Sequence, residues 1–223
     1  MVRGTISSLA VIASASALLS GCASYQAMPF IEQGSASTLV EHRERDGIHV
    51  AVRDLSASHT AEKHFGRDLQ SYGFVPVMVL IEMDADSHDA FVVRREELQL
   101  VLRDGTRLSS VDPELVIGSV AFSHWRSAFA FMFLLPGPSV VSSVNTANRD
   151  LEEDYLRKSL RSVRVSPNMR EYQGVVFFQV PEDPGSGVSC DDAFVEVTIY
   201  KEARKAAGTP LGARLEFPVH FSD

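Results

Sequence analysis

The sequence predicts a mainly β fold, an antiparallel β-sandwich with a helical hairpin inserted in its middle. Seven or eight short segments either alternate apolar and polar residues or are apolar on both faces. Turn-forming residues separate these segments, and strands do not alternate regularly with helices, which argues against a βαβ fold. Between about residues 112 and 162 the apolar spacing changes to that of helices.

The predicted strands cover residues 47–54, 72–83, 91–93, 97–108, 173–180, 193–200 and 214–221. In the first of them Ile48, Val50 and Val52 share one face. The second is apolar on both faces, as in a strand buried between two layers. Because Pro76 has no backbone N–H, we expect its nitrogen to face away from a neighbouring strand or to lie at a bulge. In the fourth, the pair Asp104-Gly105 predicts a hairpin turn.

The first helix of the insert is predicted to begin at an Asp-Pro pair. Asp112 is suited to cap the helix, and Pro113 to occupy its first position, where a missing N–H has no cost. The helix is expected to run from Glu114 to about Leu135. We expect it to end there because Pro136-Gly137-Pro138 cannot supply donors to a helix interior.

The second helix of the insert is predicted over residues 145–160. Its apolar stripe consists of Leu151, Tyr155, Leu156 and Leu160. Two oppositely charged pairs at i,i+4 spacing, Glu153 with Arg157 and Asp154 with Lys158, have the favourable order for a helix. The sequence therefore indicates an amphipathic helix.

The stretch "AFAFMFLLPGPSVV", residues 128–141, is the most apolar part of the chain outside its N-terminus. It offers only eight uninterrupted apolar residues before Pro136, too few to span a membrane. We expect it to form the core of the helical insert, with a shallow dip into a lipid leaflet or contact with another subunit as alternatives. The candidate partner surface consists of Trp125, Phe129, Phe131 and Phe133.

The N-terminus predicts export from the cytoplasm. Arg3 precedes a charge-free run from about Ile6 to Leu19, which is too short to span a bilayer and is typical of a secretory signal peptide. The following Leu19-Ser20-Gly21-Cys22 resembles the lipobox of bacterial lipoproteins. That resemblance implies cleavage between Gly21 and Cys22 and lipid attachment to Cys22. Because Ala23 rather than aspartate follows the cysteine, it also implies the periplasmic side of the outer membrane.

The resulting organisation has three parts. Residues 1–21 are expected to be the signal peptide, and residues 22–46 the lipidated cysteine and a flexible tether. Residues 47–223 are expected to form the sandwich domain with its insert at about 112–162. An alternative for the tether is that part of it packs as an extra edge strand.

Composition limits the classes of partner. The net charge of −8 becomes −9 without the signal peptide, which disfavours binding to nucleic acid or adhesion to anionic lipid headgroups. A hydrophobic content of 45% is enough for one good core. If Cys22 carries lipid, Cys190 has no partner within the chain, so we expect a fold without a disulfide.

The sequence contains no recognisable catalytic motif such as G-x-S-x-G, a Walker-type loop, H-E-x-x-H or C-x-x-C. His59 and His64 are five residues apart and do not share a helix face. Residues 84–89 gather three carboxylates but fail the EF-hand spacing, so a solvated hairpin turn is expected there. Two aspartates beside Cys190 disfavour its thiolate. We therefore expect no catalytic residue, no cofactor and no metal site.

The body, including the strand "GVVFFQV" after a polar turn, resembles immunoglobulin-like modules of bacterial envelope proteins. The resemblance implies the sandwich but no particular activity. We expect a noncatalytic, membrane-anchored module that binds an envelope protein or a glycan, or supports envelope assembly. The alternative is a periplasmic hydrolase whose site forms only in the fold, which a pocket with two histidines and a carboxylate would favour.

Overall fold

The structure is a computed structural model that describes residues 24–26, 29, 35–39, 42–122, 137–180, 193–202 and 214–220. The chain divides into two compact units. One comprises residues 1–26 and 121–151, and the other comprises residues 27–120 and 152–223. All of the strands named below belong to the second unit.

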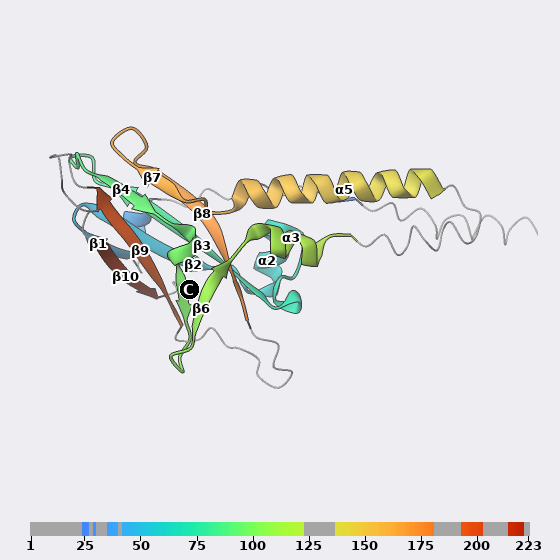
Figure 1. Cartoon of the computed structure of the whole chain (residues 1–223), viewed down its shortest axis with the longest axis horizontal. Coiled ribbons are helices and arrows are strands. Elements are labelled where there is room, and N and C mark those ends of the chain that lie inside the picture. Colours follow the sequence, from blue (N-terminus) through green and yellow to red (C-terminus); the bar gives the residue numbers. More distant parts are fainter. Residues whose placement is uncertain are drawn as a thin grey trace, which may run out of the picture. The chain divides into compact units, whose positions relative to one another are not determined.

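The second unit is built on one large antiparallel sheet of ten strands (Figure 1). The strands are β1 (His42–Arg45), β2 (Ile48–Asp54), β3 (Phe74–Met83), β4 (Ala90–Val93), β5 (Gln99–Val101), β6 (Arg107–Val111), β7 (Val163–Val165), β8 (Glu171–Gln179), β9 (Phe194–Glu202) and β10 (Arg214–His220). Their order in the sheet is β1-β2-β3-β8-β6-β5-β9-β4-β7, and β10 pairs with β9. The prediction of a mainly β, antiparallel fold is therefore confirmed.

Three α-helices are present in the described part of the chain: α2 (Ser58–Phe65), α3 (Pro113–Val120) and α5 (Gly137–Lys158). Short 3-10 turns are η1 (Ala36–Thr38), η2 (Gln70–Tyr72) and η3 (Arg95–Glu97). Among the described residues, no helix combines the length and the apolar character needed to cross a membrane.

One cluster of buried apolar side chains draws on every named strand except β1. Ile48, Val50 and Val52 of β2 belong to it and are fully buried, as their alternation predicts. Alternate residues of β3, β8, β4 and β9 join the same cluster. The strands from β2 to β7 in the sheet order therefore share one core.

The opposite face of β8 is covered by helices, which is why β3 and β8 are apolar on both faces. Phe177 of β8 lies 5.6 Å from the ring of Phe65 at the end of α2, and 6.2 Å from the ring of Tyr155 in α5. The Phe65 and Tyr155 rings are 5.2 Å apart, and all three side chains are buried. These rings form a second layer over this face of β8.

Pro76 lies inside β3 without interrupting its pairing to β8, where it stands opposite Phe177. Its carbonyl accepts the N–H of Leu55, just beyond the end of β2 at Asp54. In a strand the nitrogen and the carbonyl of one residue point to the same side, so the missing donor faces the side on which β2 has already ended. The sequence expectation for this proline is met without a bulge.

The predicted strand over 97–108 is a hairpin of two strands, β5 and β6. Leu102 N–H donates to Thr106 O, and Gly105 takes a positive φ of 85° between them, as the Asp-Gly signal predicts. β6 then continues to pair with β8 through Ser110 and Val111. This strand therefore joins the β8 side of the sheet to the β9 side.

The helical insert differs from the expectation in its boundaries. Asp112 caps α3 as predicted, since its Oδ1 accepts the N–H of Glu114 at 3.0 Å, but α3 ends at Val120. α5 begins at Gly137, eight residues before the predicted start, because Pro138 falls in the first turn, where helices tolerate proline. Within α5 the pair Asp154–Lys158 is present, whereas Arg157 pairs with Asp154 rather than with Glu153.

Two strands, β1 and β7, were absent from the sequence expectation. β1 lies within the range expected as a tether and pairs with β2, which corresponds to the alternative of an extra edge strand. β7 pairs with β4. Both are short, and β1, with the sequence HRER, has no apolar residue to signal it.

Several predicted features lie outside the described residues. They are the cleavage site Gly21 and Cys22, the candidate partner surface Trp125, Phe129, Phe131 and Phe133, most of the apolar stretch 128–141, and Cys190.

Candidate functional site

The candidate site is formed by the β1–β2 hairpin and the end of β3. The hairpin turns through Asp46 and Gly47, both with positive φ, so Glu44 stands directly opposite His49. Asp84 follows β3, and its backbone N–H donates to Gly47 O at 3.0 Å. The turn therefore fixes the place at which the Asp84 side chain leaves the backbone.

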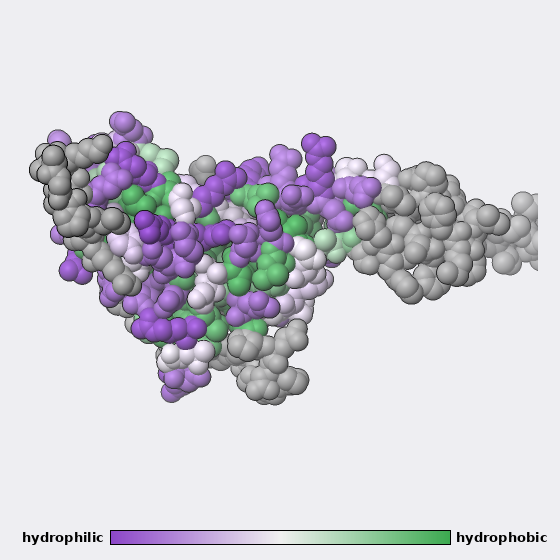
Figure 2. Space-filling view, viewed as in Figure 1, coloured by the Kyte–Doolittle hydropathy of each residue, from purple (hydrophilic) through white to green (hydrophobic). Residues whose placement is uncertain are grey.

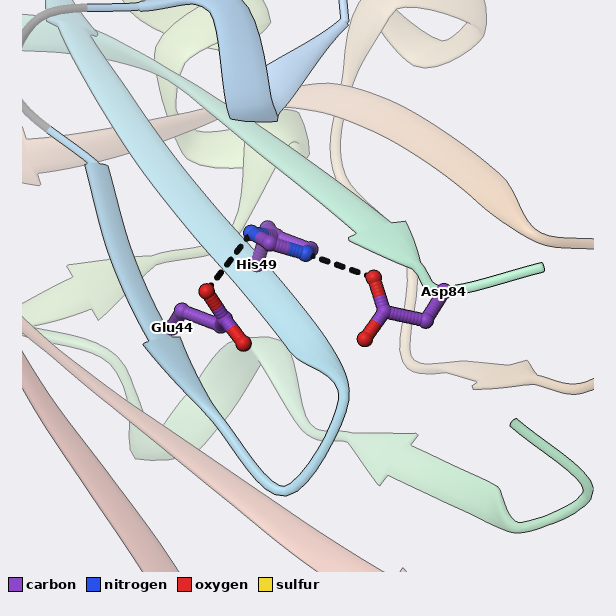
Figure 3. A group of neighbouring side chains, drawn as sticks. All are labelled: Glu44, His49 and Asp84. Atoms are coloured by element: carbon purple, nitrogen blue, oxygen red, sulfur yellow. Dashed lines mark hydrogen bonds and ion pairs between the residues drawn. The ribbon is translucent and has the colours of Figure 1, made fainter. Parts of the chain in front are cut away.

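Figure 3 shows the imidazole of His49 between two carboxylates. His49 Nε2 lies 2.8 Å from Asp84 Oδ1, and Nδ1 lies 3.9 Å from Glu44 Oε2. The His49 side chain is 12% exposed, whereas those of Glu44 and Asp84 are 57% and 46% exposed. One metal-ligating atom from each of the three residues can be chosen so that all lie within 4.8 Å of one another.

The two nitrogens of His49 are not equally satisfied. A carboxylate only accepts hydrogen bonds, so at 2.8 Å the proton of Nε2 is donated to Asp84. Nδ1 is buried and has no hydrogen-bond partner. In a neutral imidazole Nδ1 would then direct a lone pair toward the Glu44 carboxylate, which is electrostatically unfavourable.

Two further ionisable groups flank His49. The centroids of the His42 and His49 rings lie 5.8 Å apart, and His42 Nδ1 is hydrogen-bonded to Leu39 O at 2.7 Å. Glu82, opposite His49 on β3, accepts hydrogen bonds from Ser35 Oγ and from the Ser37 N–H. Burial alone would raise the pKa of Glu82, but these hydrogen bonds and the nearby His49 hold it below its ordinary value.

A surface pocket of about 580 Å³ adjoins this group, and Asp84 belongs to both. Its lining consists of Asp46, Gly47, Asp84, Asp86, Ser87, His88 and Asp89. It thus contains four aspartates and, among its lining residues, no lysine or arginine. Lys201 Nζ lies 2.7 Å from Asp89 Oδ2 and offsets one of the four charges, and the remaining negative potential attracts cations.

The expected hairpin turn at residues 84–89 is not a hairpin. It joins β3 to β4, and these strands pair with other strands rather than with each other. The loop therefore crosses between two parts of the sheet. This crossing could not be predicted from the sequence, because the order of strands depends on pairings distant in sequence.

The predicted histidine candidates separate in the structure. His49 and His88 are brought to the same carboxylate-rich region, His49 through Asp84 and His88 as part of the pocket lining. His59 is exposed on α2 and His64 is buried, as expected for residues that do not share a face. His124 and the side chain of His220 lie outside the described residues.

Glu44 was missed by the sequence analysis, although a signal for it exists. Asp46-Gly47 is a two-residue turn of the kind found in hairpins, and it places Glu44 opposite His49. Asp84 carries no comparable signal of its proximity to His49.

The chain matches no protein-family model, no curated protein and no solved structure.

Proposed function

We propose that the protein is a lipoprotein of the bacterial envelope, anchored in the outer membrane and facing the periplasm, that acts as a noncatalytic binding or assembly module. The observation that carries the anchor is the order of Arg3, an apolar run, and Leu19-Ser20-Gly21-Cys22. Two acyl chains suffice for stable anchoring, because each buried CH₂ contributes about 0.8 kcal/mol. No other membrane element is required by this proposal.

We further infer that the sheet folds over its core as an immunoglobulin-like sandwich. The support is the shared core, in which β2, β3 and β8 bury side chains in the same cluster as β4, β5 and β9. The antiparallel pairing throughout the named strands agrees with this architecture.

The noncatalytic part of the proposal is supported by the surroundings of His49. A hydrolase of the serine or cysteine type needs a hydroxyl or thiol bonded to the ring nitrogen that does not face the carboxylate. In the described part of the chain, His49 Nδ1 has no hydrogen-bond partner at all. The pocket lining contains one hydroxyl, Ser87, and one histidine, His88, but Ser87 makes no hydrogen bond to His49 Nδ1, and this favours binding over the alternative of a periplasmic hydrolase.

The partner we propose is an envelope protein or a glycan, with Trp125, Phe129, Phe131 and Phe133 as the contact surface. Among the described residues, the large hydrophobic side chains that are exposed are Tyr72, Leu115 and Met169, from three different elements. On the face drawn in Figure 2, hydrophilic residues predominate and hydrophobic residues form small patches among them. These observations direct the search for a partner toward the apolar stretch of the insert.

The anchor is tested by acyl-chain labelling in cells. A Cys22→Ser variant should lose the label and leave the membrane fraction, while the matched Cys190→Ser variant should keep both properties. Unchanged labelling of Cys22→Ser would reject the anchor.

The binding role is tested by cross-linking in cells, affinity capture of the lipoprotein and mass spectrometry. One envelope partner should recur, and its recovery should fall when Trp125 or Phe131 is replaced by alanine. Tyr72→Ala, at an exposed aromatic on another element, is the control. The absence of a reproducible partner would count against an assembly role.

A further inference from the structure

We propose that His49 Nε2 and Asp84 bind a divalent first-row cation of the Zn²⁺ type, with Glu44 orienting the imidazole through Nδ1–H. This goes beyond the proposed envelope role and does not depend on lipid attachment. It also departs from the sequence expectation of no metal site, which rested on the absence of metal-binding motifs, on the spacing of His59 and His64, and on the spacing within residues 84–89.

The first support is the geometry of the hydrogen bond between His49 and Asp84. The two atoms are 2.8 Å apart and share one proton. Two ligands of a tetrahedral zinc ion, each about 2.0 Å from the metal, are about 3.3 Å apart. For a cation to replace the proton, the distance between His49 Nε2 and Asp84 Oδ1 therefore has to increase by only about 0.5 Å. The Asp84 side chain is 46% exposed and able to move by this amount.

The second support is the buried nitrogen on the other side of the ring. Metal-bound histidines nearly always donate their second N–H to a carboxylate or a carbonyl. Here Nδ1 has no hydrogen-bond partner, and the Glu44 carboxylate lies 3.9 Å away. When a cation replaces the proton at Nε2, the remaining proton resides on Nδ1, and Glu44, on the edge strand β1, can close the hydrogen bond.

The third support is the charge around Asp84. The adjoining pocket contributes Asp46 and Asp86, which can complete the coordination directly or through water, whereas Asp89 is paired with Lys201 at 2.7 Å. An imidazole ligand favours zinc and similar metals over Ca²⁺ and Mg²⁺, which prefer oxygen alone. The combination of one buried imidazole and several carboxylates therefore points to Zn²⁺ rather than Ca²⁺.

The experiment is a Zn²⁺ titration of the full chain, purified in detergent and stripped of metal with a chelator. Calorimetry should give one saturable site. His49→Gln and Asp84→Asn should each weaken Zn²⁺ at least about tenfold, and Glu44→Gln about tenfold, the usual effect of losing an orienting carboxylate. His59→Gln, at an exposed histidine of α2, should leave the affinity unchanged.

Nitrogen NMR of the imidazoles supplies a second readout on the same samples. Zn²⁺ should shift Nε2 of His49 and leave Nδ1 protonated, with proton release on binding. If His49→Gln is not folded, Glu44→Gln decides the outcome, because Glu44 is 57% exposed and its replacement is tolerated. The proposal is overturned if no saturable site exists, if wild type and Glu44→Gln bind equally, if excess Ca²⁺ displaces Zn²⁺, or if only His42 or His88 shifts.

Discussion

Gly174 is the residue whose identity the structure constrains most sharply. A Cβ at this position of β8 would lie 2.6 Å from Leu160 Cα and 2.9 Å from Leu160 N. At the same place Leu160 N–H donates to Val175 O at 2.8 Å, where the chain that leaves α5 meets β8. The contact is between backbones, so neither side can yield by rotating a side chain.

Gly174→Ala should therefore destabilise the protein by about 3 kcal/mol, the upper part of the usual range for overpacking. Urea unfolding followed by circular dichroism measures the change. Gly118→Ala is the matched control, because Gly118 is exposed inside α3 and a Cβ there meets nothing within 4 Å. The control should gain up to about 1 kcal/mol from helix propensity, and equal effects of the two substitutions would refute the steric explanation.

His64 should make the stability depend on pH. Burial is the main cause that lowers its pKa below 6.5, and the charges of Lys158, Lys63 and Arg53 act in the same direction. As pH falls through 6.5 the unfolded chain takes up a proton that the folded chain does not, so the free energy of unfolding decreases. Above that pH the contribution of His64 is constant.

Urea unfolding between pH 7.5 and 5 tests this expectation. His64→Gln should flatten the slope, whereas His59→Gln should retain it, since His59 is exposed. The pKa of Glu82 is lowered as well, but the stability that Glu82 contributes is lost only as pH falls below its ordinary value of 4.5. The pH ranges in which His64 and Glu82 affect stability are therefore separate. If the free energy of unfolding of His64→Gln still decreases as pH falls, the pH dependence belongs to another group.

At the scale of elements, α5 is joined to α2 by a buried polar contact. Lys158 Nζ donates to Asp154 Oδ2 and to His64 O, and both charged side chains are at most 1% exposed. The Tyr155 hydroxyl donates to Phe65 O at 3.2 Å. The carbonyls of His64 and Phe65 lie in the last turn of α2, where helix carbonyls lack partners within the helix.

Breaking this contact from one side should cost more than removing it. Asp154→Leu should destabilise by about 3 kcal/mol or more, because it leaves the buried Lys158 charge without its carboxylate, whereas Lys158→Met should cost less, because Arg157 still pairs with Asp154. The double variant should be clearly more stable than the sum of the single changes implies, and a double-mutant cycle in urea measures the difference. Additive single effects would show that the two charges do not interact.

The sequence predicted this pair but not its burial. The i,i+4 spacing of Asp154 and Lys158 is visible in the sequence, yet nothing local shows that α2 covers them. Strands were predictable where one face alternates, as in β2, or where both faces are apolar, as in β3. β1 was not, because its four residues are all polar, and the early start of α5 was hidden by Pro138, which usually marks a break.

At the scale of the whole molecule, the sheet order could not be predicted. β3 pairs with β8, far along the chain, and the two-residue pairing of β6 with β8 connects the parts of the sheet. No local pattern specifies these partners, since many apolar strands could exchange places without changing the pattern of burial. For the same reason the proximity of Asp84 to His49 emerges only from the fold.

The shared core leads to a prediction about what holds this body together. Every named strand except β1 buries side chains in one cluster, so the β body should unfold in a single cooperative transition. The sequence has two cysteines, Cys22 and Cys190, and we assign the first to lipid attachment. Stability should then include no disulfide contribution.

Urea unfolding of the full chain in detergent should therefore give the same midpoint with and without a thiol reductant. Cys190→Ser should shift the free energy of unfolding by less than the roughly 2 kcal/mol that marks the lower end of a disulfide's contribution. A disulfide would instead contribute about 2–5 kcal/mol, which the reductant would abolish. A midpoint that falls on reduction and in Cys190→Ser alike would show that the two cysteines are joined, and it would remove Cys22 from its role as the lipid-bearing residue.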